Sequence, residues 1–492
     1  MTKFLPKAIA IAVSLGAAAS AHATDVNSDG LGEVLLYPAY TVSQGNDTAI
    51  SVTNTTNVIK AVKVRFLEGM NSQEVLDFNL YLSPRDVWNG VITRTETGAK
   101  LSTQDKSCTA PQIPAGGVEF RSFQYTGTEY QNGKGGPQGT DRTRIGHVEL
   151  IEMGVVDPAF AVAPGVTAQT AIVHTAQGVP GNCAAVSAAF QAGGAWAGVN
   201  VDNGISAPTG GLYGVGTITN VFAGTQIGFD ATALENFADQ PSLHFAPGTI
   251  DPSLANSSPI ATFSDGTAVG FTRGIDAVSA VLAKTALFNE YAVGAGVDAA
   301  TDWVITFPTK YAYVNVPLAQ PLADQPFLNK WSAASIANVP GSACQPIAPA
   351  YWDREEQTQA AGGIDFSPTP VVGGVSLCFE TNIVSFGDSE VLAVAGDYVR
   401  FNFPVVKETG WAAIAFNDVA YAIAGTAGTV SGGVFAPLPV ASTTTVSGLP
   451  AIGFAMLEVS NGQLENNGVN VLSNYSAAWD HKATVSRTVV AD

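Results

Sequence analysis

The chain has 492 residues, a formal net charge of −19 and only 13% charged residues. The excess of 41 acidic over 22 basic residues disfavours contact with phosphate backbones and anionic membranes, which argues against nucleic acid as a partner. Apolar residues make up 46% of the chain, and Gly and Pro are plentiful, a balance typical of an exported β-rich protein.

Residues 1–23 predict a secretory signal peptide. Lys3 and Lys7 form a short basic region, an apolar run follows, and Ala21 and Ala23 provide the small residues of a cleavage site. The run is too short to cross a bilayer, and no later stretch reaches the roughly 18 apolar residues that a span needs. Cleavage would leave 492 − 23 = 469 residues. We therefore expect an exported protein without a transmembrane span, at the cell surface or extracellular, with the periplasm as the alternative.

The start of the mature chain, "TDVNSDGLGEVLLY", has the D-x-N-x-D-G spacing that opens a calcium loop. The possible ligands, including one later carboxylate, are Asp25, Asn27, Asp29 and Glu33. The twelfth position of a full loop supplies a bidentate acid, but here it is Leu36 in an apolar run. The sequence allows a calcium site, while a solvated turn before the first strand is the favoured interpretation.

Residues 24–154 predict an N-terminal antiparallel β-sandwich. In "KAVKVRF" the apolar Val62 and Val64 alternate with charged residues, as in a strand with one buried face. The first strand, "EVLLYPAYTV", is apolar on both faces, yet Pro38 lacks the N–H that a central strand needs. We therefore expect this strand at a sheet edge, covered by other parts of its own chain.

Residues 155–300 are rich in Ala and Gly and predict a mixed α+β insertion or subdomain. Helices are expected to begin at Cys183, at Asp276 as an N-cap and after Asp230, and a hairpin is expected over residues 210–231.

Residues 301–492 return to alternating patterns such as "DWVITF" and predict a C-terminal β-sandwich. The expected fold class is mainly β, with antiparallel sandwich domains of Ig-like or jelly-roll type around the central insertion.

The four cysteines of an exported chain with no C-x-x-C motif favour two disulfides over a zinc site. The simplest of the three pairings is sequential, namely Cys108 with Cys183 and Cys344 with Cys378.

Several long blocks of the chain resemble a family of exported and cell-surface proteins of Gram-negative bacteria for which no activity is known. The blocks are "GEVLLYPAYTV", "NDTAISVTNTT", "KAVKVRFLEGMNSQEVLDFNLYLSPRDVW", "DKSCT", "GLYGVGTITNV", "TDWVITFPTK", "WDREEQ" and "LSNYSAAWDHK". They occur in order along nearly the whole mature chain. The resemblance implies a surface protein and provides no catalytic residue.

The sequence offers little evidence of catalysis. It contains no H-E-x-x-H, no G-x-S-x-G and no Walker loop. The segment "YWDREEQ" concentrates aromatic and acidic residues and is a possible ligand loop, although a solvated loop inside the second disulfide ring is the favoured interpretation. Its candidate ligand residues are Tyr351, Trp352, Asp353, Glu355 and Glu356.

The favoured function is that of a secreted, acidic, non-enzymatic cell-surface protein with a structural or adhesive role. One alternative is a carbohydrate- or polymer-binding protein or a hydrolase. Another is a subunit of an extracellular filament assembled by strand addition. The expected partner is a cell-surface or extracellular polymer, or another copy of the chain, and calcium is the one cofactor considered.

Overall fold

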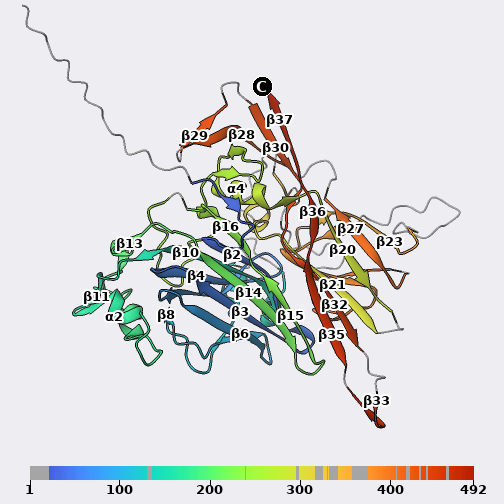
Figure 1. Cartoon of the computed structure of the whole chain (residues 1–492), viewed down its shortest axis with the longest axis horizontal. Helices are drawn as coiled ribbons and strands as arrows, with labels where there is room; N and C mark the ends of the chain where they lie inside the picture. The colour runs from blue at the N-terminus through green and yellow to red at the C-terminus, as the bar shows by residue number, and fades with distance from the viewer. Residues whose placement is uncertain are drawn as a thin grey trace, which may run out of the picture.

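The computed structural model describes residues 22–129, 136–238, 240–294, 298–315, 325–327, 329, 331, 342–356, 375–405, 407–416, 422–431, 434–438, 442–460, 465–471 and 473–491. It is mainly β, as predicted, and its strands form several predominantly antiparallel sheets (Figure 1). The predicted signal peptide lies outside the described residues, except for its last two positions.

The first sheet forms the middle of the N-terminal half. Its order is β1 (Asp25–Val26), β16 (Thr232–Glu235), β2 (Val34–Thr41), β10 (Ile145–Val156), β4 (Ile59–Glu68), β5 (Glu74–Leu82) and β8 (Cys108–Ala110), with β13 (Ile205–Ser206) on β10. The second sheet has the order β15 (Thr225–Asp230), β14 (Leu212–Asn220), β3 (Asn46–Asn54), β6 (Val87–Arg94), β7 (Ala99–Ser102) and β9 (Val118–Glu119).

These two sheets pack face to face in a sandwich-like arrangement. Tyr37 on β2 reaches across and donates its hydroxyl proton to the carbonyl of Ser51 on β3 at 2.6 Å. Phe78 on β5 packs on Trp88 on β6 at 5.7 Å. The strands β14 and β16 come from the range 155–300 and pair with strands of the range 24–154, and β15 extends the second sheet by pairing with β14. The sheets of the first sandwich therefore draw on both ranges.

The C-terminal half adds three larger sheets. The third is β26 (Arg400–Phe403), β25 (Thr381–Phe386), β21 (Ala299–Thr306), β32 (Phe454–Ser460) and β35 (Asn474–Asp480). The fourth is β23 (Ala348–Asp353), β27 (Thr409–Ala415), β20 (Ala286–Ala292) and β36 (Lys482–Thr484). The fifth is β17 (Ile260–Thr262), β18 (Ala268–Gly270), β28 (Ala422–Ser431), β30 (Ser442–Ser447) and β37 (Ser486–Ala491), with β29 (Val434–Pro437) on β28.

The smaller elements connect these sheets. The two-stranded ladders are β11 (Ala161–Ala163) with β12 (Val166–Thr167), β19 (Ala283–Lys284) with β31 (Leu449–Pro450), β22 (Gln345–Pro346) with β24 (Ser376–Leu377), and β33 (Glu465–Asn466) with β34 (Val469–Asn470). The α-helices are short: α1 (Gly127–Glu129), α2 (Ala168–Ile172), α3 (Cys183–Ala188), α4 (Gly274–Leu282) and α5 (Tyr311–Val314).

The third sheet packs against both of its neighbours. Tyr291 on β20 stacks on Phe386 on β25 at 5.2 Å, which joins the fourth sheet to the third. On the other side, Phe229 on β15 stacks on Phe454 on β32 at 4.7 Å. A single large apolar cluster consequently runs through both halves of the chain.

Both predicted disulfides are present. Cys108 is bonded to Cys183, and Cys344 is bonded to Cys378. The first bond links β8 to the start of α3, so it fastens the helical segment to the edge of the first sheet.

The prediction that the first strand is an edge strand was wrong. β2 lies between β16 and β10, and all eight of its residues are buried. Pro38 is accommodated because β16 pairs only as far as Leu36, while the register with β10 shifts between Gly146 and Val148. Neither β16 nor β10 therefore forms a regular ladder with β2 at Pro38.

Two of the three helix predictions need correction, while the helix at Cys183 and the hairpin of β14 and β15 are confirmed. The segment after Asp230 forms β16, because its backbone pairs with β1 and β2. In α4 the N-cap residue is Arg273, and Asp276 lies in the first turn and binds the Arg273 guanidinium.

Candidate functional site

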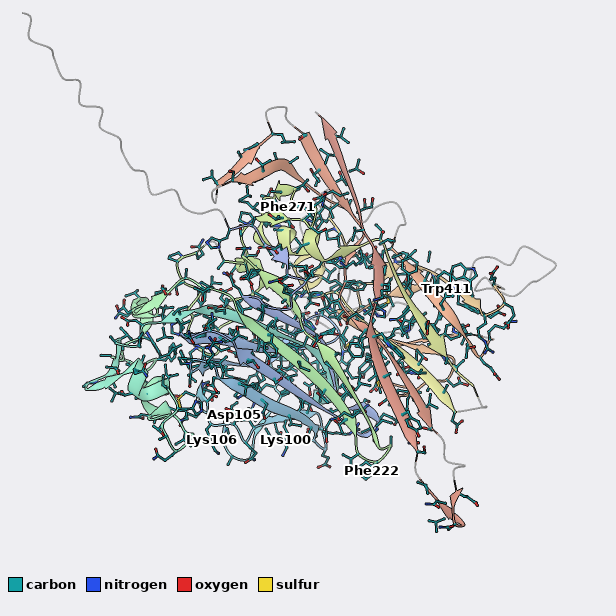
Figure 2. The ribbon with its side chains drawn as sticks, in the orientation of Figure 1. Lys100, Asp105, Lys106, Phe222, Phe271 and Trp411 are labelled. Atoms are coloured by element: carbon teal, nitrogen blue, oxygen red, sulfur yellow. A yellow bond between two sulfur atoms is a disulfide. The ribbon has the colours of Figure 1, made fainter. Side chains whose placement is uncertain are left out.

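The fourth sheet carries an aromatic patch, defined here as the exposed Trp411 and the half-buried Trp352 and Phe288. The ladder of β23 and β27 places Trp352 directly opposite Trp411, and their rings stack at 4.1 Å between centroids with a 14° interplanar angle. Phe288 on β20 continues the row, with its ring centroid 6.4 Å from that of Trp411. Trp411 is 41% exposed and lies at the right of the molecule in Figure 2.

Strand alternation explains why these rings face outward. The neighbours of Trp352 and Trp411 on the opposite face, Tyr351 and Ala412, are buried. Tyr351 packs against Phe403 of the third sheet at 5.8 Å. The buried face therefore anchors the fourth sheet, and the other face is left free to carry large aromatic side chains.

Charged side chains border the patch. Glu290 lies opposite Trp411 on β20, and Lys482 lies opposite Phe288 on β36; both are exposed. At the end of β23, Asp353 forms an ion pair with Lys407 at 2.9 Å. An apolar surface with a polar border is the usual composition of a binding surface.

The residues of the predicted ligand loop lie in different environments, because the first part of the segment forms β23 and its side chains alternate between the two faces of the sheet. Tyr351 is part of the core, Trp352 belongs to the patch, and Asp353 is held by Lys407. Glu355 and Glu356 are exposed in the turn that follows β23. Only the tryptophan of this loop therefore has a place in the aromatic patch, and the sequence reasoning missed its partner Trp411.

The four candidate calcium ligands do not converge. Asn27 forms a local turn, because its side-chain oxygen accepts from the amide of Asp29 at 2.9 Å. The buried carboxylate of Glu33 accepts from the amides of Phe237 and Ala238 at 2.9 and 3.0 Å. Asp25 accepts from the side chain of Asn236 at 3.0 Å. Within the described ranges, no group of three or more His, Cys, Asp or Glu side chains is arranged for a metal ion.

Asp25 and Glu33 instead belong to an acidic cluster with Glu235 and Glu152. Burial and the surrounding carboxylates raise the pKa of Glu235 to about 7. Glu152 accepts from the ammonium of Lys60 at 2.6 Å and from the amides of Thr209 and Gly210. The cluster thus holds one buried ion pair and carboxylates that repel one another.

A serine, a histidine and an aspartate also meet at the end of β5, which the sequence reasoning missed. Ser83 Oγ lies 2.7 Å from His174 Nδ1, and Asp86 Oδ2 lies 3.5 Å from the same ring nitrogen. In a catalytic triad the serine and the acid contact opposite nitrogens of the ring. Here the serine is buried and both groups address one nitrogen, so the geometry differs from that of a triad.

Comparisons with protein-family models, curated proteins and solved structures give no match. The resemblance to a family of exported surface proteins stays a prediction. Among the described residues, no helix has both the length and the apolar character required to traverse a bilayer.

Proposed function

We propose that this protein is an exported, non-enzymatic surface protein with an adhesive role, and that it holds a carbohydrate polymer through the aromatic patch. The observation that carries this proposal is the Trp352–Trp411 stack on the open face of the fourth sheet. Aromatic rings contact the C–H faces of sugar rings, and their low side-chain entropy makes them efficient contact residues.

Three features support the proposal. The row of rings crosses neighbouring strands, so an extended polymer can contact all of them in turn. Glu290 and Lys482 at the border can bind sugar hydroxyl groups. The two disulfides suit the oxidising environment of an exported protein. A polymer partner also agrees with the strongly acidic chain, because a neutral glycan requires no electrostatic attraction.

The test is binding of the purified mature protein to a glycan array and to insoluble polysaccharides in pull-down assays. Trp411→Ala should weaken binding by about 30-fold or more, because loss of a central aromatic contact costs about 2 kcal/mol or more. The matched control is Phe222→Ala, since Phe222 is 90% exposed in the turn between β14 and β15, away from Trp411 (Figure 2).

Weaker polysaccharide binding by the Trp411→Ala protein, with unchanged binding by the Phe222→Ala protein, supports the proposal. Failure of the unmodified protein to bind any polysaccharide, or equal binding by the Trp411→Ala and Phe222→Ala proteins, overturns it. Turnover of a bound glycan would contradict the non-enzymatic part and restore the hydrolase alternative.

A further inference from the structure

A cavity of about 320 Å³ lies between the N-terminal turn and the C-terminal sheets. Its walls come from the turn after β1, the end of β15, the β19–β31 ladder and the β35–β36 connection. The volume is at the lower end of the roughly 300–1,000 Å³ of small-molecule sites, which often lie where two structural units meet. We call it the inter-sheet cavity.

One part of the wall is acidic. Asp230 ends β15 and Asp480 ends β35, so segments distant in sequence bring two carboxylates to one cavity. Burial and the charge of Asp230 raise the pKa of Asp480, and the nearby ammonium of Lys482 offsets part of this rise. Two like charges that approach one another favour a positively charged ligand group between them.

Another part of the wall is basic. Lys284 on β19 lines the cavity, and its ammonium has no ion pair or hydrogen bond among the described residues. Burial lowers the pKa of Lys284, and its ammonium forms no ion pair with Asp230 or Asp480, which line the same cavity. A partly buried ammonium without a counter-ion favours an anionic ligand group.

The rest of the wall consists of apolar side chains and of His481, whose ring is already hydrogen-bonded within the protein. Leu282, Leu287 and Ile452 supply buried apolar surface. His481 is bonded through Nε2 to the carbonyl of Val304 at 2.9 Å, and burial lowers its pKa to about 4, so the ring is neutral. The cavity therefore combines separated charges of opposite sign with a small apolar wall.

From this arrangement we propose that the inter-sheet cavity binds a small zwitterion, a free amino acid with a compact apolar side chain. The ammonium of the ligand meets Asp230 and Asp480, its carboxylate meets Lys284, and its side chain contacts the leucines and Ile452. This site is separate from the aromatic patch and does not depend on the proposed polymer binding.

The test is isothermal titration of the mature protein with valine and with two analogues of the same shape. 3-Methylbutanoate lacks the ammonium, and isobutylamine lacks the carboxylate. Saturable binding of valine that is about tenfold or more tighter than that of either analogue is the expected result. Absence of saturable binding of valine at millimolar concentration, or equal binding of one analogue, overturns the proposal.

Variants test the assigned residues in the same assay. Lys284→Met and Asp480→Asn should each weaken valine binding by about tenfold or more. The matched controls are Lys106→Met and Asp388→Asn, which remove the same charges from exposed positions outside the cavity. Circular dichroism verifies the fold of every variant. Unchanged valine binding in both cavity variants overturns the assignment of these residues. If a variant fails to fold, the comparison of valine with its two analogues on the unmodified protein still tests the proposal.

Discussion

Arg65 on β4 lies directly opposite Glu149 on β10, and its Nη1 donates to Glu149 Oε2 at 2.6 Å. The same guanidinium donates through Nε to Glu74 Oε2 at 2.8 Å. All three side chains are buried, on the face of the first sheet that points away from the second sheet. The arginine thus compensates two carboxylates that water cannot reach, and the three charges depend on one another.

Arg65→Met should therefore lower the free energy of unfolding by about 3–5 kcal/mol, because it leaves buried carboxylates without a counter-charge. Urea unfolding followed by tryptophan fluorescence measures the change. The control Arg94→Met alters an exposed arginine on β6 and should stay within about 0.5 kcal/mol of the unmodified protein. Similar losses in the two variants would mean that Arg65 has no special structural role.

The acidic cluster should make stability depend on pH through Glu235. Its pKa is raised to about 7 in the folded protein, from an ordinary value of 4.5, by burial and by Glu33, Asp25 and Glu152. The folded state therefore retains a proton that the unfolded state releases. The resulting contribution to stability is complete below about pH 4.5 and is lost as pH rises through 7.

Glu235→Gln cannot ionise, so the stability of this variant relative to the unmodified protein should increase between pH 5 and pH 8. Thermal unfolding across this interval gives the comparison. Glu96→Gln, at an exposed position, provides the control and should show no such trend. A constant difference between Glu235→Gln and the unmodified protein over the whole range would show that Glu235 does not titrate there.

The disulfide between Cys108 and Cys183 should make a large contribution to stability. The Cys108→Ala, Cys183→Ala double variant removes a link that spans 75 residues, and we expect a loss of about 2–5 kcal/mol. Peptide mapping without reduction should still recover Cys344 joined to Cys378 in this variant. Recovery of a Cys108–Cys344 peptide from the unmodified protein would contradict the pairing.

The predictable part of the fold is the part that local alternation determines. The strands around Val62 and Val64 and the hairpin of β14 and β15 follow directly from their residue patterns. The segment after Asp230 has helix-forming residues, but it forms β16 because β1 and β2 provide partners for its backbone. Sheet pairing overrides local propensity here, and a single sequence does not reveal the partner.

The candidate site shows the same limit. Trp352 was identified from its own segment, but Trp411 is 59 positions later and meets it only through the register of β23 and β27. Lys284 and Asp480 are likewise distant in sequence and share the inter-sheet cavity only in the folded chain. Residues that come together only through the pairing and packing of sheets have no characteristic spacing in the sequence, so the sequence alone does not reveal them.

The last prediction concerns one of the hydrogen bonds that join β2 to the C-terminal half. Thr306 on β21 donates its hydroxyl proton to the carbonyl of Pro38 at 2.6 Å, and Thr306 is fully buried. Pro38 lies where neither β16 nor β10 forms a regular ladder, and this hydroxyl gives its carbonyl a donor from outside the first sheet. A buried carbonyl that loses its donor costs about 1–3 kcal/mol.

Thr306→Val removes the hydroxyl and keeps the shape of the side chain, so it should destabilise the protein by about 1–3 kcal/mol. Thr306→Ser is the matched control, because it keeps the hydroxyl and loses one methyl group, at a cost of about 0.8 kcal/mol. Denaturant unfolding of the two variants separates the hydrogen bond from packing. If the valine variant is as stable as the serine variant or more so, the Pro38 carbonyl does not depend on Thr306, and β2 is held to the C-terminal half by apolar packing and by the hydrogen bond from Thr41 Oγ1 to the carbonyl of Leu392 at 2.8 Å.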